Sequence, residues 1–175
     1  MSMKRRVLSI LVDNTSGVLS RVSGLFSRRG YNIDSLTVGV TANPRISRMT
    51  VVCSGDDLVL DQIMKQVEKL VDVRYVKVLK SDESVNRELM LIKIKVLPQQ
   101  RQSVTTTAQI FRAKIVDVAR ESMIIELTGS QDKLEAFLDI LGEYEILEVA
   151  RTGLAGLARG SEDVRFFLAR WRINP

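Results

Sequence analysis

The chain has 175 residues, of which 45% are hydrophobic and 27% charged, and its mean hydropathy is +0.04. This composition indicates a globular protein of one domain or two small ones, excludes a disordered chain, and offers no apolar stretch long enough to cross a bilayer. Because the chain has no histidine, it lacks the commonest general base and metal ligand, so we expect neither a self-sufficient enzyme nor a metal site. The single cysteine, Cys53, lies in an apolar run and is expected to be buried and free of a disulfide.

The formal net charge of +5 is concentrated in the first half of the chain. Residues 1–80 carry 13 basic and 7 acidic side chains, whereas residues 81–175 carry 13 basic and 14 acidic ones. The N-terminal residues lead directly into a strand-like run instead of the apolar segment of a signal peptide. We therefore expect a cytoplasmic protein that does not associate with a membrane.

The first half of the chain alternates between strand-like and helix-like patterns. Apolar runs predict strands, and apolar residues spaced three or four apart, such as Leu60, Ile63 and Met64, predict helices. Gly30 directly after two arginines indicates the end of the first helix. The predicted elements are strand 6–12, helix 16–29, strand 32–41, strand 46–53, helix 58–70 and strand 73–79. Their order is βαββαβ.

The same order recurs after a polar segment, residues 81–87, which we interpret as a linker. The predicted elements are strand 88–96, helix 103–111, strand 113–119, strand 123–128, a helix capped by Ser130, and strand 146–150. We therefore predict an α+β protein of two tandem ferredoxin-like βαββαβ domains, residues 1–80 and 88–160, followed by a tail over 161–175.

The turn between the first strand and the first helix, residues 13–19 (DNTSGVL), has the features of a small-ligand site. The first amides of a helix have no intrahelical partner and lie at its positive end, so they can hold a carboxylate. Asn14 adds amide donors and an acceptor, and Gly17 has no Cβ to obstruct a ligand. The same run is compatible with an ordinary N-cap, in which Ser16 or Asn14 satisfies the helix.

The second strand is an edge of the sheet in this topology, and its sequence offers little protection against self-association. It lacks proline and contains a single charged residue, Asp34. We predict a symmetric dimer through this edge, which would bring Asn32 of one chain near the 14–17 turn of the other. Taken alone, Asn32 would be interpreted as a turn residue after Gly30 and Ile33 as a core residue.

These segments, in this order, resemble the regulatory (small) subunits of acetohydroxyacid synthase, also called acetolactate synthase, with an ACT domain as the first domain. The resemblance covers residues 4–160. Beyond the 13–19 turn, it is carried by residues 28–36 (RRGYNIDSL), 47–50 (SRMT), 69–73 (KLVDV), 87–91 (RELML), 110–112 (IFR), 148–153 (EVARTG) and 156–160 (GLARG).

The resemblance implies a non-catalytic subunit in branched-chain amino-acid biosynthesis. Such a subunit activates a catalytic partner and confers feedback inhibition by valine or another branched-chain amino acid. The catalytic subunit would hold thiamine diphosphate, Mg and FAD, and this chain would hold no cofactor. By position, the effector site would use Asn14, Gly17 and Val18 of one chain with Asn32 and Ile33 of its dimer mate.

The sequence also raises two other functions and two candidate docking surfaces. A pI of about 9.6 suggests nucleic-acid binding, but only 5% of residues are aromatic, too few for a base-stacking platform. A free-standing ACT-domain sensor acting on another enzyme is the alternative function. The acidic stretch 121–150 and the segment 165–171 are both candidate surfaces for the catalytic subunit. The carboxylate pairs Asp56–Asp57 and Glu143–Glu145 are interpreted as surface charge.

Overall fold

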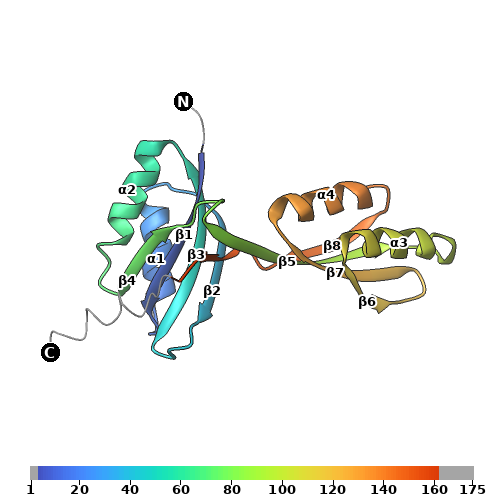
Figure 1. The fold of residues 1–175 in the computed structure, drawn as a ribbon, viewed down its shortest axis with the longest axis horizontal. Coiled ribbons are helices and arrows are strands. Elements are labelled where there is room, and N and C mark those ends of the chain that lie inside the picture. The colour runs from blue at the N-terminus through green and yellow to red at the C-terminus, as the bar shows by residue number, and fades with distance from the viewer. Residues whose placement is uncertain (1–3, 162–175) are drawn as a thin grey trace. The chain divides into compact units, whose positions relative to one another are not determined.

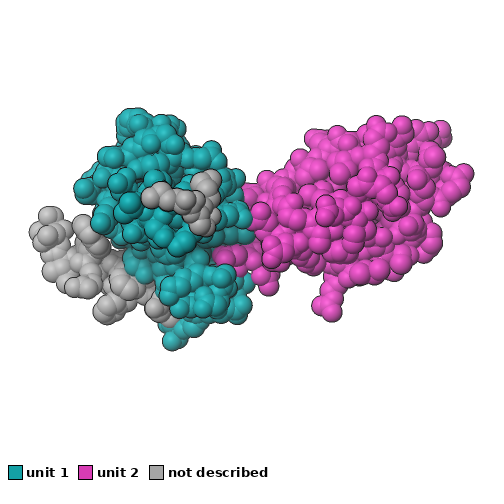
Figure 2. Space-filling view, turned by 90° about the horizontal axis from the view of Figure 1, so that it is seen from above, with its two compact units in different colours: residues 1–85, 154–175 teal, residues 86–153 magenta. Residues whose placement is uncertain are grey.

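The computed structural model describes residues 4–161, and the chain divides into two compact units. Residues 1–85 and 154–175 form unit 1, and residues 86–153 form unit 2; Figure 2 shows them in teal and magenta. The chain therefore leaves unit 1 after Val85 and returns to it at Leu154. Residues 154–160, which were predicted to belong to the second domain, therefore belong to unit 1.

Unit 1 is an antiparallel sheet with the strand order β2-β3-β1-β4 and two helices (Figure 1). Its elements are β1 (Lys4–Asp13), α1 (Val18–Arg28), β2 (Ile33–Val40), β3 (Ile46–Gly55), α2 (Asp57–Val67) and β4 (Val73–Val78). Alternate residues of β1 and β3, including Ile10 and Val51, meet Phe26 of α1 and Ile63 of α2 in one core. This confirms the first βαββαβ unit and the edge position of β2.

Unit 2 repeats the architecture with the strand order β6-β7-β5-β8. Its elements are β5 (Ser84–Lys95, which begins in unit 1), η1 (Pro98–Gln100), α3 (Arg101–Phe111), β6 (Lys114–Val118), β7 (Ser122–Gly129), α4 (Gln131–Leu141) and β8 (Ile146–Arg151). Its core is separate from that of unit 1, and within it the rings of Phe111 and Phe137 lie 5.1 Å apart. The second βαββαβ unit is thus also confirmed.

The structure departs from the predicted elements at residues 84–87 and 155–158, and it contains η1, which was not predicted. Residues 84–87, predicted as linker, form the start of β5. Strand pairing stabilises the extended backbone there although the sequence is polar. A short strand that was not predicted, β9 (Ala155–Ala158), pairs with β5. Ser130 does occupy the N-cap position of α4, but its side chain makes no capping hydrogen bond.

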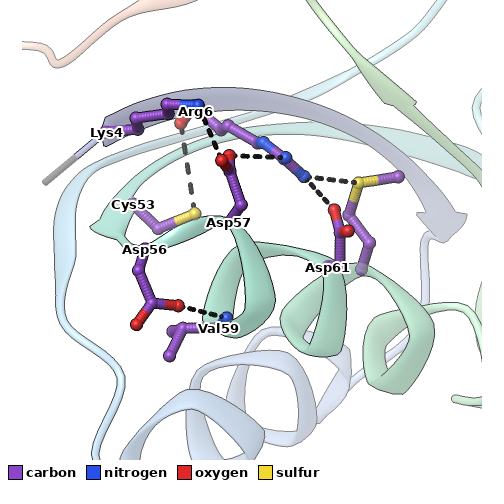
Figure 3. Close-up of polar contacts among 8 residues, drawn as sticks. Lys4, Arg6, Cys53, Asp56, Asp57, Val59 and Asp61 are labelled. Carbon is purple, nitrogen blue, oxygen red and sulfur yellow. Dashed lines mark hydrogen bonds and ion pairs between the residues drawn. The ribbon is translucent and has the colours of Figure 1, made fainter. Parts of the chain in front are cut away.

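Ion pairs attach α2 to the start of β1, and a side chain caps the first turn of α2 (Figure 3). The Lys4 ammonium lies 2.6 Å from Asp57, and the Arg6 guanidinium donates to Asp61 at 2.5 Å. Asp56 caps α2 by accepting a hydrogen bond from the Val59 amide at 2.8 Å. The carboxylates at 56 and 57 are therefore structural groups as well as surface charge.

Cys53 is buried and forms no disulfide, as expected. Burial raises the pKa of its thiol to about 11, so the thiol is protonated at neutral pH. No helix within residues 4–161 is long and apolar enough to span a membrane.

Candidate functional site

The 13–19 turn leaves the start of α1 open. Gly17 is the N-cap residue and has a left-handed backbone with φ of 82°, which favours glycine. Its carbonyl accepts the first helical hydrogen bond, from the Arg21 amide at 3.0 Å. No side chain among residues 4–161 caps α1, and the first turn of this helix contains no acidic residue. The ordinary cap by Ser16 or Asn14 is therefore not formed, and the first-turn amides have no side-chain oxygen among them.

Asn14 forms hydrogen bonds that connect this turn to the hairpin between β2 and β3. Its side-chain NH2 donates to the Pro44 carbonyl at 2.8 Å, and its side-chain oxygen accepts from the Ser47 hydroxyl at 3.1 Å. Its backbone amide donates to the Arg45 carbonyl at 2.7 Å. Because an amide NH2 has two hydrogens, one donor of the Asn14 side chain is left for a ligand.

Arg21, which the sequence did not single out, places a positive charge over the same turn. Its Nε and Nη2 donate to the Asp72 carboxylate at 2.6 and 3.0 Å, which fixes the guanidinium as a bidentate pair. A Cβ built at Gly17 would lie 2.9 Å from Arg21 Nη1. No described residue accepts a hydrogen bond from Nη1, so the donors of this nitrogen, which lies beside Gly17, are available to a ligand.

The pairing with Asp72 also fixes the protonation states beside the turn. The hydrogen bonds to Asp72 raise the pKa of Arg21, and those from Arg21 lower the pKa of Asp72. A second pair, Arg74 with Asp13, lies at the end of β1 next to the turn. Arg21 is thus a permanent cation held in one orientation. Its partner is 51 positions away in the chain, which is why spacing did not reveal it.

Val18 and Ile33, the two predicted apolar site residues, differ in exposure. Val18 is only 3% exposed and belongs to the core, so its side chain is not available to a ligand at the turn. Ile33 is half-buried and packs against the edge of that core. Ile33 is therefore the residue of this pair that offers an accessible apolar side chain.

Asn32 begins a short hydrogen-bonded chain at the start of β2. Its side-chain NH2 donates to one oxygen of Asp34 at 2.7 Å, and the other oxygen accepts from the Ser54 hydroxyl at 2.5 Å. The register of β2 against β3 shifts between Ile33 and Ser35, which makes Asp34 the extra residue of a β-bulge.

Within one chain, the two groups of predicted residues lie at opposite ends of the sheet. Ile33 of β2 pairs with Cys53 of β3, which in turn pairs with Arg6 near the start of β1. The turn follows Asp13, at the other end of β1. Those positions on β1 are separated by about 24 Å at 3.4 Å per residue. The structure brings Asn14, Gly17 and Arg21 together, and it places Asn32 and Ile33 elsewhere in the same chain.

Comparisons with known proteins agree along the chain. A family model described as "AHAS small subunit-like ACT domain" matches residues 8–75, and one described as "Small subunit of acetolactate synthase" matches residues 87–160. A probable acetolactate synthase small subunit from Archaeoglobus fulgidus is 48% identical, over 90% of this chain and 99% of that protein.

Two further relatives match over similar lengths. The small subunit of acetolactate synthase isozyme 3 from Salmonella typhimurium is 50% identical, over 92% of this chain and 99% of that protein. The crystal structure of an acetolactate synthase small subunit from Thermotoga maritima superimposes with a TM-score of 0.83 at 40% identity, covering 91% of this chain and 99% of that one. The similarity therefore extends through both units.

Proposed function

The chain belongs to the family of acetolactate synthase small subunits, and on that premise we propose that it is a non-catalytic regulatory subunit that binds a branched-chain amino acid. It would activate a catalytic subunit and confer feedback inhibition by valine or a close relative. The observation that carries this proposal is the uncapped start of α1, where Gly17 lies under the oriented guanidinium of Arg21. Thiamine diphosphate, Mg and FAD would all be held by the catalytic subunit.

The turn supplies the groups that an α-carboxylate requires. The first amides of α1 lie at the positive end of the helix, and Arg21 Nη1 adds a donor from a charged group whose other two nitrogens are paired with Asp72. The free hydrogen of the Asn14 amide gives a further donor. A carboxylate bound here would replace water with charge-assisted hydrogen bonds, each contributing about 1.5–3 kcal/mol.

A second copy of the chain would supply the rest of the site. Val40 of β2 is level with Ser47, which pairs with Val12 near the turn. If the β2 edges of two copies pair antiparallel in the register that places Ile33 of one copy opposite Val40 of the other, Ile33 lies level with the turn of that other copy. Val38 and Val40 are 43% and 60% exposed on this edge, which favours such pairing.

In this arrangement, each chemical group of valine meets a matching group of the protein. The carboxylate lies at the turn of one copy, and Asn32 of the other copy accepts a hydrogen bond from the ammonium. Ile33 provides apolar surface for the side chain. Feedback inhibition then follows from linkage, because a ligand that favours one arrangement of the paired sheets shifts any equilibrium coupled to it, typically by 1–3 kcal/mol.

The surface that docks the catalytic subunit stays a prediction. The acidic stretch 121–150 comprises β7, α4 and β8 of unit 2. The other candidate, residues 165–171, lies outside the described residues.

Capture from a cell extract tests the regulatory role. The tagged chain should co-purify with a large thiamine-dependent synthase, raise its activity and make it sensitive to valine, while the chain alone should convert no pyruvate. Capture of a different enzyme or a regulator, without a synthase, would favour the free-standing sensor. Carboligation of pyruvate by the purified chain would contradict the non-catalytic assignment.

Replacing Arg21 with glutamine should weaken valine binding by about tenfold or more, because one charge-assisted hydrogen bond to the carboxylate is lost. Isothermal titration measures the change. Valinamide, which has no carboxylate, should bind weakly to the wild type and be affected little by the substitution. Arg28→Gln, also in α1 but in its last turn, is the matched control and should bind valine normally. Equal loss of valine and valinamide binding would remove Arg21 from the carboxylate site.

A further inference from the structure

Residues 154–159, which follow the return of the chain from unit 2, form a strap that lies within unit 1. Leu154 is 6% exposed, and β9 contacts β1. Burial alternates along the strap: Leu154 and Gly156 are buried, whereas Ala155 and Leu157 are exposed. One side of the strap is therefore packed against unit 1 as a strand packs, although its sequence of small residues gave no such signal.

Both ends of the strap are fixed by hydrogen bonds, and a glycine with a left-handed backbone lies on either side of it. The Leu154 amide donates to the Ser35 hydroxyl at 2.9 Å, and the Arg159 amide donates to the Glu83 carbonyl at 2.8 Å. Gly153 and Gly160, on either side of the strap, have φ of 82° and 86°. These left-handed positions favour glycine, so both ends of the strap are built on residues that adopt this conformation without strain.

The hydrogen bond that holds the strap on β2, from the Leu154 amide to the Ser35 hydroxyl, depends on the β-bulge at Asp34. Ile33 is level with Cys53 of the core, whereas Ser35 is level with Val52, the adjacent residue, which points to the opposite face of the sheet. In a regular strand, residues 33 and 35 would share a face. Because Asp34 is the extra residue, Ile33 faces the helices while Ser35 faces the strap.

This bulge is held by a residue of the proposed effector site. The Asn32 side-chain NH2 donates to Asp34, and Asp34 also accepts from Ser54. If the ammonium of an effector donates to the Asn32 oxygen, the Asn32 NH2 group stays on Asp34, and the whole bulge becomes more rigid. Ser35, the next residue, then holds the Leu154 amide more firmly.

We propose that the strap, residues 154–159, is the element through which effector occupancy of β2 is communicated to residues 86–153. This inference rests on the proposed function, and it assigns the regulation of that site to one hydrogen bond, Leu154 N–H to Ser35 Oγ. Binding at Asn32 stabilises the bulge and tightens the strap. The strap is joined through Gly153 to β8, so its docking changes the constraint on the C-terminal end of unit 2.

Hydrogen exchange of the full chain, with and without saturating valine, tests this coupling. In the wild type, valine should slow exchange of residues 14–20 and 32–36, which report binding, and should slow residues 152–160 by about fivefold, the low end of typical coupling between sites. Residues 57–67, in α2, serve as the internal control and should change little. If valine slows hydrogen exchange at residues 14–20 but leaves exchange at residues 152–160 unchanged or faster, the proposal is overturned.

Substitutions at Ser35 separate binding from communication. Ser35→Ala should keep the valine protection of residues 14–20 and lose the response of residues 152–160. In the enzyme reconstituted with its catalytic subunit, Ser35→Ala should also raise the valine concentration for half-inhibition by about fivefold or more. Ser35→Thr keeps the hydroxyl and should behave as the wild type. Inhibition of Ser35→Ala at wild-type valine concentrations would overturn the proposal, and the absence of protection at both 14–20 and 32–36 in the wild type would contradict the proposed function itself.

Discussion

Replacing Gly17 with aspartate should weaken valine binding by about 100-fold or more, which corresponds to about 3 kcal/mol, and should abolish feedback inhibition. Three effects act together. The backbone at 17 is left-handed, which costs a non-glycine residue about 1–3 kcal/mol. The added side chain meets Arg21 Nη1, and its carboxylate would take the position and the cation intended for the ligand.

Two control variants separate these effects by isothermal titration. Gly160→Asp introduces the same charge at another left-handed glycine, with no atom near its Cβ, so it should bind valine normally. Gly17→Ala introduces the strain without the charge and should bind more weakly than the wild type but more tightly than Gly17→Asp. Feedback inhibition that persists in Gly17→Asp would remove the turn from the effector site.

Replacing Arg151 with methionine should destabilise unit 2 by about 3–5 kcal/mol. Arg151 makes a bidentate pair with Glu88, with both N–O distances 2.8 Å, and its third nitrogen lies 2.8 Å from Glu135. The Glu88 side chain is only 8% exposed, so removing its partner leaves a buried carboxylate uncompensated. These hydrogen bonds raise the pKa of Arg151, so its guanidinium keeps its charge throughout the neutral range.

Thermal unfolding followed by circular dichroism should show the loss as a lower melting temperature. For a domain of this size, the expected shift is about 12 °C or more. Lys95→Met breaks the pair with Glu145, in which both side chains are about half-exposed or more, and should shift the midpoint little. The double variant Glu88→Met, Arg151→Met should recover stability relative to Arg151→Met alone. A melting temperature unchanged by Arg151→Met would show that the Glu88 carboxylate is solvated.

Local patterns predicted most of the elements because each sheet is built from strongly apolar strands that alternate with amphipathic helices. The edge position of β2 followed from topology and is confirmed. By contrast, β9 is a strand only through its pairing with β5, and its residues, AGLA, are too small and too few to show a period. Residues 84–87 were missed for the converse reason, since a polar sequence was recruited into a long strand.

Some features of the candidate site could likewise be predicted from the sequence, and others could not. The features of Gly17 that depend on its immediate neighbours, a tight turn before an amphipathic helix, could be predicted from the sequence. The orientation of Arg21 depends on Asp72, and the engagement of Asn14 depends on Pro44 and Ser47, all of which are distant in the chain. Such contacts arise only when the sheet is assembled, so sequence spacing could not reveal them.

If each effector site combines the turn of one chain with Asn32 of another, complementation between two defective chains tests this arrangement most directly. Gly17→Asp and Asn32→Ala chains, carrying different tags, are co-expressed, and mixed dimers are purified through both tags and titrated with valine. Each variant alone should bind no valine, whereas the mixed dimer should regain one intact site, about half of the wild-type stoichiometry. Mixed dimers that bind no valine would contradict this arrangement and place the whole site within a single chain.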